Sequence, residues 1–304
     1  MSARRALAGL GSETRGTLAL AVAGLLFGST FLVVQDAIED AEPTPFLGAR
    51  FLIAAAVLAP VAWRRPAHGG EVPLGIGAGL LLASGYLFQT FGLRSTPSST
   101  SAFITYLLVV IVPVIVAVGE RRLPDRRTAT GVVIAVIGLY LLSGSGADAF
   151  GWGEVLTLLC AVCFAGHLVA VSRGADRFDP VRFTCVQILT VGVVCAVPGF
   201  WAGGYDFGAS AWGAVVFTGL FATAAAFFCM VAGQRAVPAS RAALVLLVEP
   251  VSAGILGLAT GEDLGVRGLL GAVVILAAIA WVELVPLLTG ARTDDPAVEP
   301  TVHG

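Results

Sequence analysis

The chain has 304 residues, of which 57% are hydrophobic and only 12% are charged, with a formal net charge of −2 and a mean hydropathy of +0.90. Soluble globular domains average about 45–50% apolar and about 25% charged residues. The deficit of charge excludes a water-soluble enzyme and a disordered chain, and the lack of a basic surface excludes a nucleic-acid binder. The composition predicts an integral membrane protein.

Apolar runs divide the chain from end to end. A helix that crosses about 30 Å of hydrocarbon needs about 20 apolar residues, whereas barrel strands are shorter and alternate in polarity. The runs do not alternate, so we expect an all-α integral membrane fold with ten transmembrane helices. The first run is too long for a cleaved signal peptide. The predicted spans are residues 16–35, 45–63, 72–93, 98–118, 128–145, 152–172, 181–202, 209–232, 238–260 and 265–288.

The arginines set the predicted orientation. All 18 basic residues are arginine. With a cytoplasmic N-terminus, fifteen fall in cytoplasmic segments, Arg94 and Arg267 fall in outer loops, and Arg50 falls within a span. Positive charge concentrates on the cytoplasmic side of membrane proteins. We therefore predict a multi-pass protein of the plasma membrane with both termini, residues 1–15 and 289–304, in the cytoplasm, the latter as a disordered tail.

The two halves of the chain repeat one another. We predict a first repeat over residues 16–145 and a second over residues 151–288, each with five helices. An odd number of spans inserts the second copy upside down, an arrangement typical of secondary transporters. The matching segments are Phe27-Gly28-Ser29 with Phe164-Ala165-Gly166 at an offset of 137, Arg94–Pro97 with Arg235–Pro238 at 141, Gly119-Glu120 with Gly261-Glu262 at 142, and Gly131–Ile134 with Gly271–Val274 at 140.

Several short motifs carry a family resemblance that extends over about residues 16–288. They are Gly28-Ser29-Thr30-Phe31, Ala49-Arg50-Phe51, Gly92–Thr96, Gly119-Glu120-Arg121, Glu249-Pro250-Val251 and Gly261-Glu262. The chain resembles the drug/metabolite transporter superfamily, and within it the EamA-like ten-helix transporters. The resemblance implies a carrier of small metabolites, often amino acids or their relatives, that usually acts as an exporter. The sequence departs from the family pattern at Phe27, where a tryptophan is common.

Glu249 is the strongest candidate for a substrate-binding or coupling residue. It lies midway along the ninth predicted span, where an ionisable group is costly and therefore suggests function. Pro250 follows it and cannot donate a backbone hydrogen bond, so we expect a helix break with room for a substrate amine or a proton. The alternative is a carboxyl group that only fastens helices together.

Four further residues are candidates for the same site. His167 lies in the sixth span and Arg50 in the second, where a guanidinium suits a substrate carboxylate or a structural ion pair equally. Tyr106 and Gln89 are placed to line a central cavity, although polar side chains often only bridge helices. Pro113 predicts a break in the fourth span. Pro113 and Pro250 do not occupy matching positions of the two repeats, so we do not expect the two spans to kink alike.

The sequence favours a secondary transporter, not an enzyme, that moves a small polar metabolite by alternating access. It contains no Walker motif, and no motif implies a cofactor or a metal. Protons are a candidate coupling ion, and both a monomer and a homodimer fit. Two alternatives remain at this stage: a polytopic membrane enzyme acting on a lipid-linked substrate, and a channel or sensor.

Overall fold

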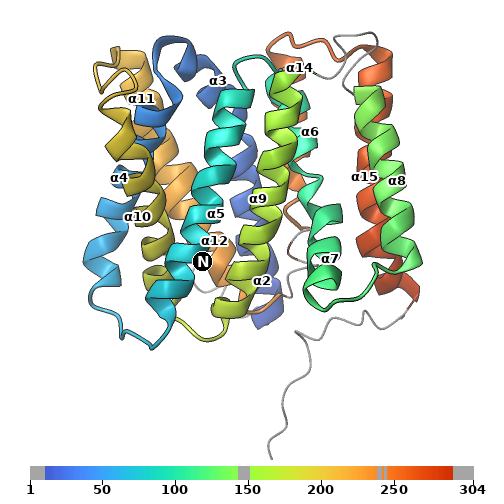
Figure 1. The fold of residues 1–304 in the computed structure, drawn as a ribbon, viewed down its shortest axis with the longest axis horizontal. Helices are drawn as coiled ribbons and strands as arrows, with labels where there is room; N and C mark the ends of the chain where they lie inside the picture. Colours follow the sequence, from blue (N-terminus) through green and yellow to red (C-terminus); the bar gives the residue numbers. More distant parts are fainter. Residues whose placement is uncertain (1–10, 143–150, 238–241, 243–244, 290–304) are drawn as a thin grey trace, which may run out of the picture.

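The computed structural model describes residues 11–142, 151–237, 242 and 245–289, and all regular structure in those residues is helical. The helices run side by side between two levels, as Figure 1 shows. Eight helical segments in this part of the chain are long and apolar enough to cross a membrane. They are Ser12–Asp40, Pro43–Ala62, Glu71–Gly92, Ser98–Gly119, Trp152–Ala175, Pro180–Gly199, Ala209–Gln234 and Gly265–Val282. The prediction of an all-α membrane fold is confirmed.

Two of the ten predicted spans are not among these eight segments. The fifth corresponds to α8 (Arg126–Leu142), which has 17 residues. The ninth contains α14 (Val248–Ala259), an apolar helix of 12 residues. Residues 238–241 and 243–244 of that span lie outside the described part of the chain. The count of ten transmembrane helices therefore stays a prediction.

Proline and aspartate mark several helix starts. α10 (Pro180–Gly199) begins on a proline, which needs no intrahelical hydrogen bond at that position. The Asp179 side chain accepts hydrogen bonds from the backbone N–H groups of Val181 and Arg182 at 3.0 and 3.2 Å. α4 (Pro43–Ala62) also begins on a proline. These signals fix where the chain enters each helix, whereas the apolar run that follows fixes its length.

The helices pack in pairs that join distant parts of the sequence. α4 packs on α10, α5 (Glu71–Gly92) on α9 (Trp152–Ala175), α2 (Ser12–Gly28) on α12 (Ala226–Gln234), and α8 on α15 (Gly265–Thr289). At Gly48 of α4, an added Cβ would lie only 2.6 Å from the Ala196 Cα of α10. The two backbones are therefore in direct contact, which is how small residues stabilise helix pairs in lipid.

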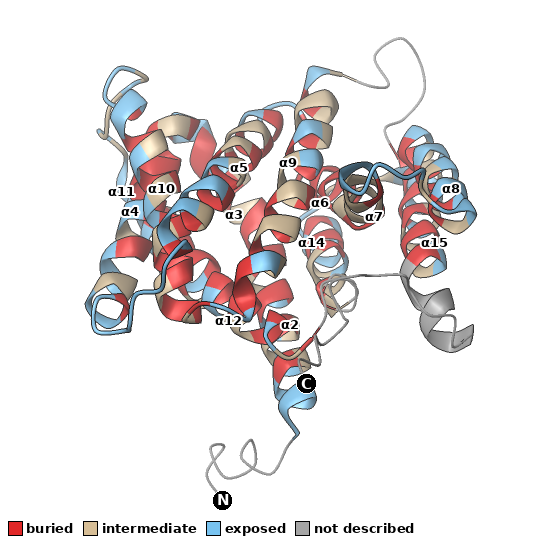
Figure 2. Ribbon diagram, turned by 60° about the horizontal axis from the view of Figure 1, so that its bottom comes forward, coloured by how far each residue is buried: buried red, intermediate tan, exposed pale blue. Residues whose placement is uncertain are grey.

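Large apolar side chains also cover the outside of the bundle. Val57, Val133, Ile255 and Val273 are each at least half exposed, on α4, α8, α14 and α15. In Figure 2 the buried residues face the interior of the bundle and the exposed ones face outward. An apolar periphery of this kind suits a surface that contacts lipid rather than water.

Several membrane segments are broken near the middle. Ser29 separates α2 from α3 (Thr30–Asp40), and a turn at Tyr106 and Leu107 separates α6 (Ser98–Thr105) from α7 (Leu108–Gly119). A second turn, at Leu246 and Leu247, precedes α14. These two turns lie 140 residues apart, which is an offset of the predicted repeat.

The breaks do not fall at the prolines themselves. α7 continues through Pro113, its sixth residue, because a proline removes only one intrahelical hydrogen bond, and the turn lies six residues upstream. Pro250 is the third residue of α14. A residue there would ordinarily donate to the Leu246 carbonyl, which instead accepts the backbone N–H of Glu249 at 2.8 Å. The break thus lies at the carbonyl that the proline leaves without its usual donor.

The eighth predicted span contains both α-helical and π-helical segments. α11 (Ala209–Phe217) leads into a wider π-helical segment, η1 (Thr218–Ala225), and then into α12. π-Helical turns are rare and frequently mark functional sites. This segment packs against α4, and an added Cβ at Gly219 would lie 2.9 Å from the Arg50 carbonyl oxygen.

Candidate functional site

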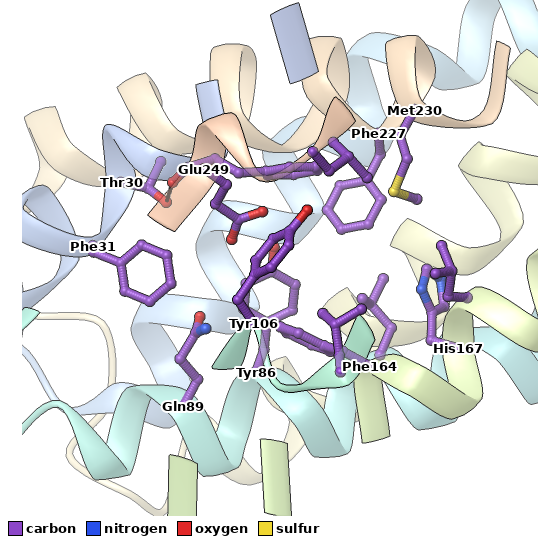
Figure 3. Close-up of a pocket in the computed structure, with 15 residues that line it drawn as sticks. Thr30, Phe31, Tyr86, Gln89, Tyr106, Phe164, His167, Phe227, Met230 and Glu249 are labelled. Carbon is purple, nitrogen blue, oxygen red and sulfur yellow. Dashed lines mark hydrogen bonds between the residues drawn. The ribbon is translucent and has the colours of Figure 1, made fainter. Parts of the chain in front are cut away.

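A cavity lies inside the bundle, where helices of both halves of the chain meet. Its wall is formed by α2, α3, α5, α9 and α12, by the two turns that precede α7 and α14, and by the first turns of these two helices. Figure 3 shows the side chains converging on it. The lining residues are Phe27, Thr30, Phe31, Leu82, Tyr86, Gln89, Tyr106, Leu108, Phe164, His167, Leu168, Phe227, Met230, Leu246 and Glu249.

Glu249 reaches this cavity from the first turn of α14. Its carboxylate points toward the Tyr86 and Tyr106 rings, both within electrostatic range (Figure 3). Among the described residues, none donates a hydrogen bond to the carboxylate and none forms an ion pair with it. Among the lining residues that the structure describes, Glu249 and His167 are the only ones with an acidic or basic side chain. The carboxylate is therefore available to a ligand in the cavity.

The backbone at Glu249 is held by close packing against α2. An added Cβ at Gly28 would lie 2.5 Å from the Glu249 carbonyl oxygen and 1.9 Å from the Ser252 Oγ. Only glycine allows α2 and α14 to approach this closely without a shift. Gly28 thus sets the position from which Glu249 enters the cavity.

His167 is held in place by a side chain of α10. Its Nε2 lies 2.8 Å from the Gln187 Oε1, and the Gln187 Nε2 donates to the Phe183 carbonyl at 3.1 Å. Because the amide nitrogen is already a donor to the backbone, the amide oxygen accepts, and His167 donates from Nε2. Neutral His167 then has Nδ1 as its acceptor.

Gln89 and Tyr106 line the same cavity from the first half of the chain. The Gln89 Nε2 donates to the Thr105 Oγ1 at 3.2 Å, which ties α5 to the end of α6. Tyr106 occupies the turn between α6 and α7 and is 2% exposed. Four of the five predicted site residues, Glu249, His167, Tyr106 and Gln89, are therefore brought together.

Arg50 is the fifth predicted site residue, and the structure places it behind the cavity wall. Its Nε donates to the Thr223 Oγ1 of η1 at 2.8 Å. Its guanidinium carbon lies 5.1 Å from the Tyr86 ring centroid and 5.4 Å from that of Phe51. Arg50 is 1% exposed and is absent from the cavity wall. Tyr86 thus separates this cation from the cavity.

Aromatic rings form much of the wall, and sequence reasoning did not select them apart from Tyr106. Ring centroids are 5.0 Å apart for Phe27 and Phe227, and 5.1 Å for Tyr86 and Phe164. Phe31 lies across from Gln89 (Figure 3). A helical spacing could have indicated them, because Tyr86 precedes Gln89 and Phe164 precedes His167 by three residues, which places each pair on one helix face.

The cavity is small in this conformation. The centres of water molecules can occupy about 70 Å³ of it. At about 10–15 Å³ for each water, this corresponds to roughly five to seven water molecules. The cavity has room for the head group of a small metabolite but not for a large ligand without an opening movement.

A cavity at the meeting point of apolar helices long enough to cross a membrane defines a multi-pass membrane protein with a candidate site inside the helix bundle. The model of the EamA-like transporter family matches the chain twice, over residues 14–144 and 151–284. The chain belongs to the EamA-like transporter family, and the resemblance seen in the sequence motifs is confirmed.

Relatives and a solved structure resemble the chain over most of its length. An "Uncharacterized transporter" of Archaeoglobus fulgidus is 30% identical over 88% of this chain and 85% of its own. "Uncharacterized transporter YwfM" of Bacillus subtilis is 25% identical over 89% of this chain and 94% of its own. A solved structure titled "Crystal structure of protein" has a TM-score of 0.67 at 20% identity, covering 91% of this chain and 99% of that one, which supports the fold.

Proposed function

We propose that this protein is a secondary transporter that moves a small polar metabolite across the plasma membrane by alternating access. The observation that carries the proposal is the cavity itself, which is lined by both segments that match the family model and holds the Glu249 carboxylate. Export is the direction that the family resemblance implies.

We also propose an inverted duplication of five helices, which fits this mechanism. Twelve of the fifteen lining residues pair at the repeat offsets: Phe27 with Phe164, Thr30 with His167 and Phe31 with Leu168 at 137, Tyr86 with Phe227 and Gln89 with Met230 at 141, and Tyr106 with Leu246 at 140. A cavity whose walls are exchanged by the repeat lies on the axis that relates the two copies. Exchange of conformations between the copies would then open it alternately to either side.

Helix packing supports the same symmetry. Exchange of the repeats turns the contact of α5 with α9 into the contact of α12 with α2, and both contacts are present. The contacts of α4 with α10 and of α8 with α15 exchange with themselves. On this basis we propose ten transmembrane helices, with α8 and the ninth span as the two that complete the count.

The orientation follows from the placement of the arginine-bearing connections. The loop between α4 and α5 and the loop between α7 and α8 lie at the same end of the bundle in Figure 1. These loops carry Arg64, Arg65, Arg121 and Arg122. We propose that this end faces the cytoplasm together with both termini.

Labelling of single cysteines tests this topology. In a background with the five native cysteines replaced, Arg121→Cys should react with a membrane-impermeant maleimide only in inside-out vesicles. Asp206→Cys, in the loop between α10 and α11, should react in intact cells. Reaction of both residues from the same side would contradict the inverted duplication.

Glu249 is the residue that we propose to bind the substrate and to exchange it with protons. In proteoliposomes that contain the purified protein, uptake of a transported metabolite should be saturable and stimulated by counterflow. These two properties separate a carrier from a channel. Glu249→Gln should abolish flux or remove its pH dependence. Glu120→Gln is the matched control, because Glu120 lies outside the cavity and pairs with Arg122. Wild-type flux and pH dependence in Glu249→Gln would refute the role of Glu249.

A further inference from the structure

The cavity wall combines one carboxylate with a surround of aromatic rings. Six rings line it, those of Phe27, Phe31, Tyr86, Tyr106, Phe164 and Phe227. Aromatic rings attract a cation that lies within about 6 Å of the ring centroid, most strongly where water is excluded. A surround of rings with an acidic group is how proteins recognise alkylammonium groups. The wall thus favours an organic cation over a neutral or anionic ligand.

The charges around the cavity point the same way. Glu249 is the acidic group among the described residues of the wall, and Arg50, whose guanidinium contacts the Tyr86 ring, is held behind that ring by its bond to Thr223. A ligand carboxylate would therefore meet Glu249 and the negative faces of the rings, without direct access to the Arg50 guanidinium. A ligand ammonium would be attracted both by the Glu249 carboxylate and by the negative faces of the rings.

Two other polar side chains of the wall, Gln89 and His167, offer acceptors to a donor on the ligand. The Gln89 amide nitrogen is used by Thr105, and the His167 Nε2 is used by Gln187. Their other polar atoms, the Gln89 Oε1 and the Nδ1 of neutral His167, are acceptors. An ammonium carries several N–H donors and no acceptor, which matches this set.

We propose that the cavity binds a small organic amine in its ammonium form, with the charged nitrogen at Glu249 and the carbon substituents against the aromatic rings. The inference rests on the proposed transport function only for its biological meaning, since binding can be measured without transport. It narrows the substrate class from small polar metabolites in general to amphipathic ammonium compounds that lack a neighbouring carboxylate.

Three ligands that share a phenylethyl group test the proposal. They are 2-phenylethylamine, L-phenylalanine and 3-phenylpropionate, which present an ammonium, a zwitterion and a carboxylate. Binding to the full-length protein in detergent is measured by isothermal titration calorimetry at pH 7. We expect 2-phenylethylamine to bind at least tenfold more tightly than the other two. Equal or tighter binding of L-phenylalanine or 3-phenylpropionate overturns the proposal, and so does a lack of 2-phenylethylamine binding at 10 mM.

Variants locate the site within the protein. Glu249→Gln should weaken 2-phenylethylamine binding at least tenfold, whereas Glu120→Gln should leave it unchanged. Phe164→Leu should weaken it severalfold, with Phe200→Leu, an exposed ring outside the wall, as the control. Unchanged affinity in both Glu249→Gln and Phe164→Leu overturns the proposal, provided that thermal melting shows both variants folded. Should either variant fail to fold, Phe227→Leu and Glu249→Asp take its place.

The binding and flux experiments fail independently. Ammonium binding without flux in proteoliposomes would contradict the transporter and leave the site intact. Saturable flux of a neutral or anionic metabolite, with no ammonium binding, would contradict the site and leave the transporter intact.

Discussion

Glu262 accepts two hydrogen bonds from Ser98, one from its backbone N–H at 3.0 Å and one from its hydroxyl. The second carboxylate oxygen accepts the corresponding pair from Ser99. Ser98 is the first residue of α6, so the carboxylate caps the positive end of that helix. The contact also joins the loop after α14 to the start of α6, which couples two segments of opposite halves of the chain.

We predict that Glu262→Gln lowers stability by about 1–3 kcal/mol, the usual effect of losing charge-assisted hydrogen bonds. Thermal unfolding in detergent at pH 7 measures it. Glu39→Gln, at an exposed acidic position on α3, is the control and should melt with the wild type. A Glu262→Gln melting curve that overlays the wild type would show that the cap contributes nothing.

The same contact predicts a pH dependence. Burial raises the pKa of Glu262, but the hydrogen bonds from Ser98 and Ser99 outweigh this effect and hold its pKa below the ordinary value. A group with a lowered folded-state pKa stabilises the fold above its unfolded pKa, about 4.3, and loses this effect as the pH falls through the folded value. The stability difference between wild type and Glu262→Gln should therefore shrink below about pH 4.3. A difference that grows in acid would show the opposite linkage.

Gly28 allows α2 to contact the backbone at Glu249. Gly28→Ala would place its Cβ 2.5 Å from the Glu249 carbonyl oxygen, and the helices must separate by about 1 Å to relieve the clash. We expect a loss of about 1–3 kcal/mol and a clear loss of flux, measured by melting and in proteoliposomes. Gly77→Ala on α5 is the control, since an added Cβ there meets nothing within 4 Å. Equal behaviour of the two variants would contradict this packing role.

The bond between Arg50 and Thr223 fastens α4 to the π-helical segment. Thr223→Val removes the acceptor and leaves a buried charged donor without its partner, so we expect a cost of about 1.5–3 kcal/mol. Thr218→Val, in the same segment, removes a hydroxyl that bonds only to its own helix and should cost less. Thermal unfolding compares the two. A larger loss of stability in Thr218→Val than in Thr223→Val would assign the stabilisation to hydrogen bonds within the π-helical segment rather than to the bond with Arg50.

Gln187 positions His167 rather than lining the cavity. Gln187→Leu should free the imidazole ring to turn, lower stability by about 1–3 kcal/mol, and weaken ligand binding severalfold. Gln234→Leu is the matched control, because both polar atoms of Gln234 are buried without a partner among the described residues. Isothermal titration calorimetry measures the affinity for 2-phenylethylamine, and thermal melting measures the stability. Unchanged ligand affinity in Gln187→Leu would assign the bond to helix packing.

The sequence by itself determined the solvent of this protein and the class of its fold. Apolar runs of about 20 residues can satisfy their backbone in lipid only as helices, so length and hydropathy sufficed. A buried ionisable group is costly wherever the helix lies, so Glu249 and His167 could be selected before any contact was known. The order of the short motifs along the chain was sufficient to predict the family.

The tertiary structure alone decided which of those groups share a cavity. Arg50 and Glu249 are equally conspicuous as intramembrane charges, yet Tyr86 and Thr223 hold the first behind the wall while the second faces the cavity. The aromatic wall likewise depends on which helix faces meet. These outcomes depend on contacts between residues that are distant in the sequence, such as Arg50 with Thr223 and Phe27 with Phe227, and local composition carries no record of such contacts.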